Sequence, residues 1–169
     1  MKNIVFTVVL LTCLHSVIHG ETVEMTAGPD FTVSYDPGTW KPLAPLRRPE
    51  PGAFQSMTWA FQSTEWAEIT ITSHPEPKKE AEFKQEVLDA QKFRGDPAEF
   101  VRERRESIAG QEWLVLEFRN PNTRPARSEI HYFLPAADGY ATLFLVAEEA
   151  SLPTHRGAID ALIHTIRLK

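Results

Sequence analysis

The sequence predicts an α+β fold: an antiparallel β-sheet of about six to seven strands flanked by two main helices, forming an α/β/α sandwich. Three observations predict it. Short segments in which apolar and polar residues alternate recur along the chain, as half-buried strands require. Turn sequences separate most of these segments, which favours hairpins and antiparallel pairing. Two longer segments, 78–93 and 154–166, carry apolar residues at helical spacing instead.

The first twenty residues have the layout of a secretory signal peptide. Lys2 supplies a positive charge, an almost unbroken apolar run follows over Ile4–Leu14, and small Gly20 precedes the acidic Glu21. This apolar run is too short for a membrane-spanning helix, which needs about 20 apolar residues. We therefore expect cleavage after Gly20, an exported location (periplasmic or secreted) and no stable membrane insertion after cleavage.

Removal of residues 1–20 from the 169-residue chain leaves one domain, 21–169, and changes the net charge from -5 to -6 because Lys2 is lost. The acidic balance argues against binding to nucleic acid or to anionic membrane surfaces, which need basic clusters. The only cysteine, Cys13, is lost as well, so the mature domain has no disulfide and no thiolate nucleophile. Lipidation of Cys13 stays an alternative, although the preceding Leu-Leu-Thr matches a lipoprotein box poorly.

The N-terminal half of the domain predicts three strands. Phe31–Tyr35 alternates apolar and polar residues and ends in the turn sequence Asp36–Trp40. A Pro-rich irregular loop near 37–51 follows, because five prolines fall within it. Strands over Gln55–Phe61 and Ala67–Thr72 then pair as a hairpin.

The C-terminal half predicts both helices and a strand meander. Phe83 and Val87 lie on the buried side of the first helix, for which Gly95 provides a stop signal. The mixed charges of Phe100–Ile108 suit an edge strand. The next strands cover Glu112–Arg119, Glu129–Leu134 and Tyr140–Ala147. The last of these is apolar on both faces, which predicts a central position in the sheet.

Four segments, taken in their order along the chain, resemble the fold family of PsbP, the photosystem II extrinsic protein, and of the Ran release factor. They are Asp36–Trp40, Ile108–Glu112, Tyr140–Leu145 and Ile159–Leu168. The resemblance spans about residues 28–169, and exported bacterial proteins of unassigned role look similar. It implies a single PsbP-like domain with an α/β/α sandwich, and a binding or accessory role rather than catalysis. No ligand residue of these relatives matches a motif in this chain.

The usual catalytic motifs are missing from the sequence. It contains no Gly-x-Ser-x-Gly elbow, no Walker loop, no Gly-x-Gly-x-x-Gly and no His-Glu-x-x-His. Four histidines remain in the mature chain, and none has the spacing of a metal-ligand pair: His74, His131, His155 and His164. We therefore expect no catalytic residue, no metal and no cofactor that a motif would identify.

One polar cluster is predicted on the hairpin of Glu112–Arg119 and Glu129–Leu134. A register that pairs their all-apolar faces would gather on the other face Glu117, Glu129 and His131. Two carboxylates beside an imidazole suit a divalent metal or acid–base catalysis, and Glu68 could join them. The alternative is a solvated rim of a half-covered sheet.

The loop of this hairpin predicts a second candidate site. It carries Arg119, Arg124 and Arg127 with no acidic residue among them, so it could bind an acidic partner or a small anion. An ordinary solvated loop is the alternative.

Two function classes stay open on the sequence alone. The favoured one is an exported, non-catalytic binding or accessory protein whose partner is another exported protein or a small anionic ligand. The other is a small metal-dependent or acid–base hydrolase that would use Glu117, Glu129 and His131. The two differ in a structural prediction, because the hydrolase requires these three side chains to converge in one pocket.

Overall fold

The computed structural model describes residues 22–27, 31–42, 57–63, 67–136 and 139–168. The predicted signal peptide, Cys13 and residues 43–51 of the Pro-rich loop lie outside these residues. Within them the chain forms two helices and ten strands, which are arranged in two sheets.

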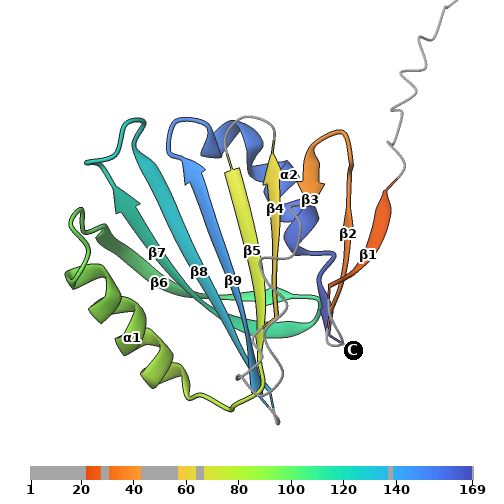
Figure 1. Ribbon diagram of the computed structural model, residues 1–169, viewed down its shortest axis with the longest axis horizontal. Helices are drawn as coiled ribbons and strands as arrows, with labels where there is room; N and C mark the ends of the chain where they lie inside the picture. Colours follow the sequence, from red (N-terminus) through yellow and green to blue (C-terminus); the bar gives the residue numbers. More distant parts are fainter. Residues whose placement is uncertain (1–21, 28–30, 43–56, 64–66, 137–138, 169) are drawn as a thin grey trace, which may run out of the picture.

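Seven strands form one large antiparallel sheet (Figure 1). Their order across the sheet is β3 (Trp40–Pro42), β4 (Met57–Ser63), β5 (Ala67–His74), β9 (Gly139–Glu148), β8 (Arg127–Ala136), β7 (Gln111–Asn120) and β6 (Glu99–Ile108). Every neighbouring pair is antiparallel. The α+β prediction is confirmed, and so is the central position of the strand over 140–147.

A small second sheet joins the two ends of the described domain. Its order is β1 (Val23–Ala27), β2 (Phe31–Tyr35) and β10 (Arg167–Leu168). The Thr165 hydroxyl donates to the backbone carbonyl of Ser34 at 2.7 Å and accepts from the Ser34 N–H at 3.0 Å. The sequence predicted β2 but neither β1 nor β10, and the two residues of β10 are too few to show alternation.

The turn after β2 forms as predicted, but it ends one residue earlier than its sequence suggested. The Asp36 carboxylate accepts hydrogen bonds from the Gly38 N–H at 2.8 Å and from the Thr39 hydroxyl at 2.9 Å. Trp40 then begins β3, and its indole is buried in the core. A bulky aromatic residue directly after a turn therefore starts an edge strand here.

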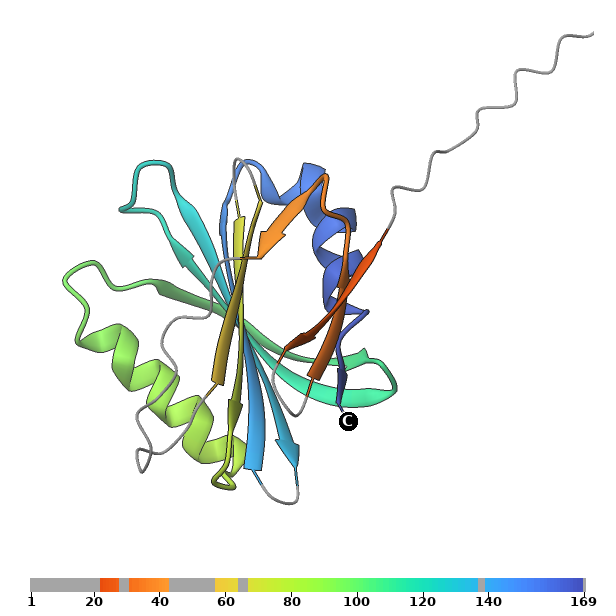
Figure 2. The same ribbon diagram turned by 45° about the vertical axis from the view of Figure 1, so that its right-hand side comes forward.

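The large sheet is covered on both faces (Figure 2). On one face α1 (Glu80–Lys92) contributes Phe83 and Val87 to a core with Leu116 and Phe133. On the other face α2 (Leu152–Ile163) and the small sheet pack on a larger core. The predicted α/β/α sandwich is confirmed, with the small sheet added to the layer of α2.

The two helices begin and end close to their predicted bounds. The Glu82 carboxylate accepts a hydrogen bond from the Lys79 N–H at 3.2 Å, which satisfies a free donor at the start of α1. The helix α2 ends three residues before its predicted bound. There the N–H groups of Thr165 and Ile166 bond to carbonyls three residues back, and this tighter turn leads the chain into β10.

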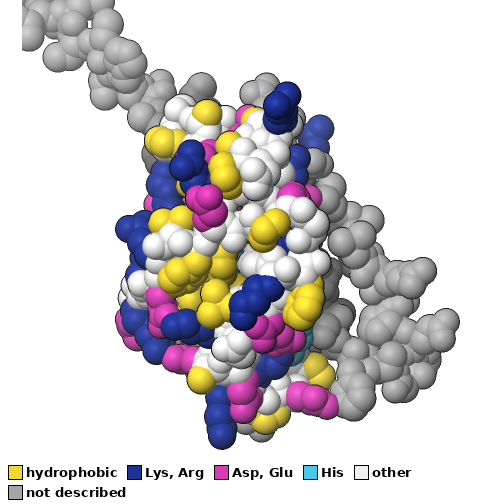
Figure 3. Space-filling view, turned by 90° about the vertical axis from the view of Figure 1, so that its left-hand side faces the viewer, with side chains coloured by type: hydrophobic (Ala, Val, Ile, Leu, Met, Phe, Trp, Pro, Cys, Tyr) yellow, Lys and Arg dark blue, Asp and Glu magenta, His cyan; other side chains and the backbone are white. Residues whose placement is uncertain are grey.

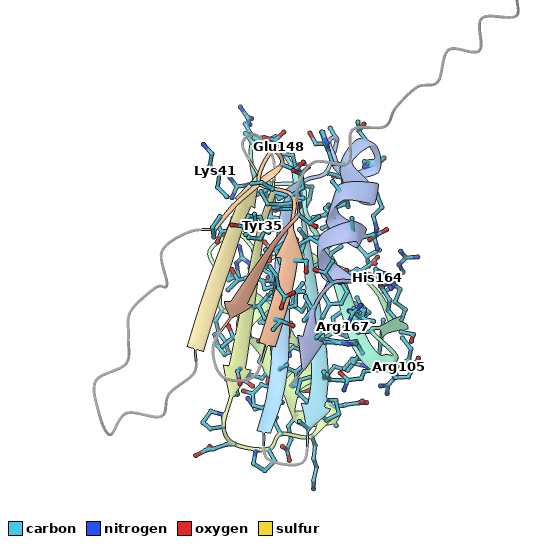
Figure 4. The ribbon with its side chains drawn as sticks, turned by 90° about the vertical axis from the view of Figure 1, so that its right-hand side faces the viewer. Tyr35, Lys41, Arg105, Glu148, His164 and Arg167 are labelled. Atoms are coloured by element: carbon cyan, nitrogen blue, oxygen red, sulfur yellow. The ribbon has the colours of Figure 1, made fainter. Side chains whose placement is uncertain are left out.

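The charged strand β6 lies at the edge of the large sheet, as predicted. Its charges are paired with both flanking layers. Toward α1, Glu80 pairs with Arg105 at 2.5 Å and Lys84 pairs with Glu103 at 2.5 Å. Toward α2, His164 lies 3.8 Å from Glu106. Figure 4 shows His164 and Arg167 on the side of the molecule that carries α2. The mixed charges of β6 therefore connect the sheet to the helices on both of its faces. They also keep this edge strand from pairing with another molecule.

Substitution of Gly139, at the start of β9, tests how closely β9 packs against β5. Its φ is +157°, and a Cβ there would lie 2.1 Å from the backbone oxygen of His74. We expect Gly139→Ala to lower the free energy of unfolding by about 1–3 kcal/mol in urea denaturation, because the strands must separate to admit the methyl group. Gly95→Ala is the matched control, since no atom lies within 4 Å of its Cβ position. Equal effects of the two substitutions would contradict this account.

Candidate functional site

The β7–β8 hairpin decides which side chains meet on each face of the large sheet. Its register places Leu116 opposite His131 and Phe118 opposite Glu129. Directly opposed residues of an antiparallel pair project from the same face. The predicted pairing of the all-apolar faces was therefore wrong by one residue. Glu117 lies on the opposite face from Glu129 and His131, so the predicted Glu/His cluster does not form.

The error has a physical cause. Both faces of β7 are apolar: Trp113 and Val115 are buried on one face, and Leu114, Leu116 and Phe118 on the other. Hydrophobicity alone therefore does not select between the two registers. The observed register instead places Glu129 of β8 beside its hydrogen-bonding partners, Gln91 in α1 and Arg94 just after it.

Glu129 is the buried carboxylate of this site. Only 3% of its surface is exposed, and it lies beneath the C-terminal end of α1. It accepts hydrogen bonds from Gln91 Nε2 at 3.2 Å and from Arg94 Nη1 at 2.7 Å. The Gln91 side-chain oxygen in turn accepts from Arg94 at 3.3 Å. Glu129 therefore joins α1 to the sheet, and both of its described partners lie in or just after the helix.

His131 is a largely buried neutral imidazole. Its ring lies 5.5 Å from the Phe118 ring and 4.5 Å from the Phe144 ring, measured between centroids. The pKa of His131 is lowered to about 4, mainly by burial; the charge of Glu129 opposes this lowering and the charge of Arg94 adds to it. Its Nε2 atom is buried and has no hydrogen-bond partner among the described residues.

A groove of about 260 Å³ runs between α1 and the sheet beside His131. At its other end the His74 ring stacks on Tyr140, with centroids 4.1 Å apart and planes 5° from parallel. The Lys78 ammonium lies 5.1 Å from the centre of the Tyr140 ring and forms an ion pair with Glu86. The groove thus has aromatic walls, and the two charges at one end, on Lys78 and Glu86, cancel each other.

Glu117 belongs to an ion-pair network on the α2 face. It accepts from Arg102 at 2.5 Å and from Arg104 at 2.9 Å. Burial acts to raise the pKa of the Glu117 carboxyl, but these two arginines outweigh it and hold the pKa below its ordinary value. Glu117 is thus an ionised partner for arginines.

The three loop arginines do not form one cluster. Arg119 pairs with Glu149 at 2.8 Å. Arg124 and Arg127 are exposed, and neither has an ion pair within the described part of the chain. The positive charge that remains available at this loop therefore comes from two residues rather than three.

Glu68 lies on the α1 face, where Val146 separates it from Glu129. Its side chain is exposed, so it could be reached from solvent but does not join the buried site. Among the described residues, no three His, Cys, Asp or Glu side chains are placed to hold a metal ion.

Arg94, Tyr140 and the role of Gln91 were not predicted from the sequence. Gln91 does carry a signal, because a polar residue in line with Phe83 and Val87 on a helix implies a buried partner. The strand predicted over Ala67–Thr72 extends to His74 in the structure. The stack of His74 on Tyr140 depends on strand register and has no signal in the sequence.

Comparison with known proteins establishes the fold. No protein-family model and no curated protein matches the sequence. Cyanobacterial PsbP from Synechocystis superposes with a TM-score of 0.60 at 15% identity, covering 94% of this chain and 99% of that chain. The chain has a PsbP-like fold. A chain from Bacteroides thetaiotaomicron gives a TM-score of 0.51 at 11% identity, covering 89% of this chain and 48% of that one.

The PsbP-like fold confirms the resemblance expected from the four sequence segments. At these identities the likeness concerns the fold alone, so residue roles are argued from this chain. None of the described helices of the PsbP-like domain is long and apolar enough to cross a membrane.

Substitution of Arg94 should lower the free energy of unfolding more than substitution of Glu129. Arg94→Met leaves the buried carboxylate without its cation, so we expect it to cost about 2 kcal/mol in the free energy of unfolding. Glu129→Gln retains the side-chain volume and leaves Arg94 partly in water, so we expect it to cost about 1 kcal/mol. Urea denaturation measures both, and the reverse order would contradict the assigned burial.

The depressed pKa of His131 predicts a pH-dependent stability. Below pH 6.5 the unfolded chain takes up a proton on this residue and the native state does not, until the pH approaches about 4. Stability should therefore fall as the pH drops from 7 to 5, with His131 contributing about 2 kcal/mol. His131→Phe should remove this part of the loss. If parent and variant lose equal stability over this range, the assignment is wrong.

Proposed function

We propose that this chain is an exported accessory protein that binds an acidic partner protein at the end of the molecule where α1 passes into β6. The signal-peptide layout of residues 1–20 supports export, and the PsbP-like fold is consistent with an accessory role. A group of exposed hydrophobic side chains at this end carries the proposal.

Three large hydrophobic side chains stand in solvent within a short stretch of chain. The exposed fractions are 87% for Phe93, 46% for Phe100 and 55% for Val101. The β6–β7 register shifts between Phe100 and Arg102, so Val101 is the extra residue of a bulge, and bulges re-aim side chains. Figure 3 shows hydrophobic side chains among charged ones on the side facing the viewer. Exposed apolar groups rimmed by charge are typical of protein-binding surfaces.

A hollow of about 230 Å³ lies next to this group. Its lining includes Val101, three arginines and two glutamates, the charged residues being Arg102, Arg119, Arg156, Glu117 and Glu149. Interfaces concentrate their binding energy where an anchor side chain fills such a pocket, and arginine is enriched at these positions. The hollow therefore offers a place for one side chain of the partner.

Two exposed arginines of the β7–β8 loop, Arg124 and Arg127, favour an acidic partner at this end. The register places the β7–β8 loop beside the start of β6, with Glu99 opposite Arg119. Since Arg119 is paired, Arg124 and Arg127 are the cations left to face a partner. We call Phe93, Phe100, Val101, Arg124 and Arg127 the docking end. A partner of complementary charge would be steered to it.

The test uses a photo-crosslinking amino acid at Val101, in the full chain expressed in its native host. We expect a discrete cross-link to an acidic exported protein, and a purified chain that begins at Glu21 by mass spectrometry. The identified partner, purified, should then bind Val101→Asp and Arg124→Glu/Arg127→Glu roughly tenfold or more weakly than the parent.

Val23 is the matched control, because it is also an exposed valine, at 41%, but lies on β1. The same crosslinker at Val23 should give no such product, and Val23→Asp should leave partner affinity unchanged. Cross-links of equal strength at both valines, or none at Val101, would overturn the proposal.

A further inference from the structure

The groove between α1 and the sheet is a second surface, separate from the docking end. The helix contributes Phe83, Val87 and Ala90 to its walls, and the sheet contributes His131, Tyr140 and Thr142. Phe83 and Val87 are buried, whereas Ala90 is exposed. The groove therefore opens to solvent beside Ala90 and deepens toward His131.

Nearly all polar groups along the groove already have partners. His74 Nε2 lies 3.3 Å from Thr142 Oγ1, and the Lys78 ammonium is paired with Glu86. The Gln91 amide is held between Glu129 and Arg94. His131 Nε2 differs from them, because it is buried without a partner among the described residues. An unpaired buried polar atom of this kind is costly unless a further group satisfies it.

The dimensions and charge of the groove indicate which kind of ligand could form a hydrogen bond with His131 Nε2. An apolar cavity of about 150 Å³ holds a benzene molecule, so about 260 Å³ accommodates one ring or two fused rings. The single lysine and glutamate of the lining neutralise each other, which favours a neutral ligand. Phe83 and Tyr140 provide aromatic surfaces for stacked or edge-to-face contacts with a ring.

We propose that this groove binds a neutral aromatic molecule of one or two rings whose single hydroxyl or N–H group forms a hydrogen bond with His131 Nε2. The ring lies between Phe83 and Tyr140, and the polar group points to the floor formed by β8. None of the described residues that line this groove belongs to the docking end, so the two surfaces bind separately.

Phenol and toluene test the proposal directly, because they have nearly the same shape and only phenol forms the hydrogen bond. Titration of the full chain with each, followed by NMR, should show both binding beside His131, with phenol roughly tenfold tighter. In His131→Phe the aromatic ring is kept but the nitrogen is lost, so the preference for phenol should disappear. If the parent binds neither compound at millimolar concentration, or if the preference survives in His131→Phe, the proposal is overturned.

A second pair of variants locates the site without touching His131. Ala90→Phe should fill the mouth of the groove and abolish binding of both compounds. Ala81→Phe is the matched control, because Ala81 is also exposed and lies on the opposite side of α1 from Ala90. It should leave both affinities unchanged. Binding that resists Ala90→Phe would place the compounds elsewhere and would contradict the assigned groove.

Discussion

Val115 lies opposite Tyr132 in the β7–β8 hairpin, and the two different faces of the large sheet follow from this register. One face receives Trp113, Val115 and Tyr132 and is covered by α2 with the small sheet. The other receives Glu129 and His131 and lies under α1. A shift of one residue would exchange the faces and leave the carboxylate of Glu129 on the side that lacks Arg94. The register therefore sets both the packing and the chemistry of the molecule.

The contact of α1 with the sheet combines apolar packing and a buried charge. Phe83 stacks on Phe133 with ring centroids 4.7 Å apart, and the Arg94–Glu129 pair fixes the C-terminal end of the helix. A buried carboxylate needs such a partner to remain ionised at low cost. Because the helix is held at these points, a groove remains along the sheet strands beside it. The neutral His131 and the proposed ligand site are consequences of this geometry.

The sequence predicted the architecture well because most strands are long enough to show alternation. Helix α1 and strands β4 to β9 were predicted within a few residues, and the PsbP-like fold agreed with four short segments. Strand β10 was missed because two residues carry no pattern. The Glu117, Glu129 and His131 cluster was wrong because β7 is apolar on both faces, so its pattern allowed two registers. Only the position of α1, with Gln91 and Arg94, distinguishes between them.

The register is tested most directly by nuclear Overhauser contacts of the His131 ring. The account predicts contacts to the rings of Phe118 and Phe144, whose centroids lie 5.5 Å and 4.5 Å away. It predicts none to Trp113 or Val115, which project from the other face. Contacts from His131 to either of these two residues would show that the hairpin pairs in the other register, and would contradict the assignment of both faces.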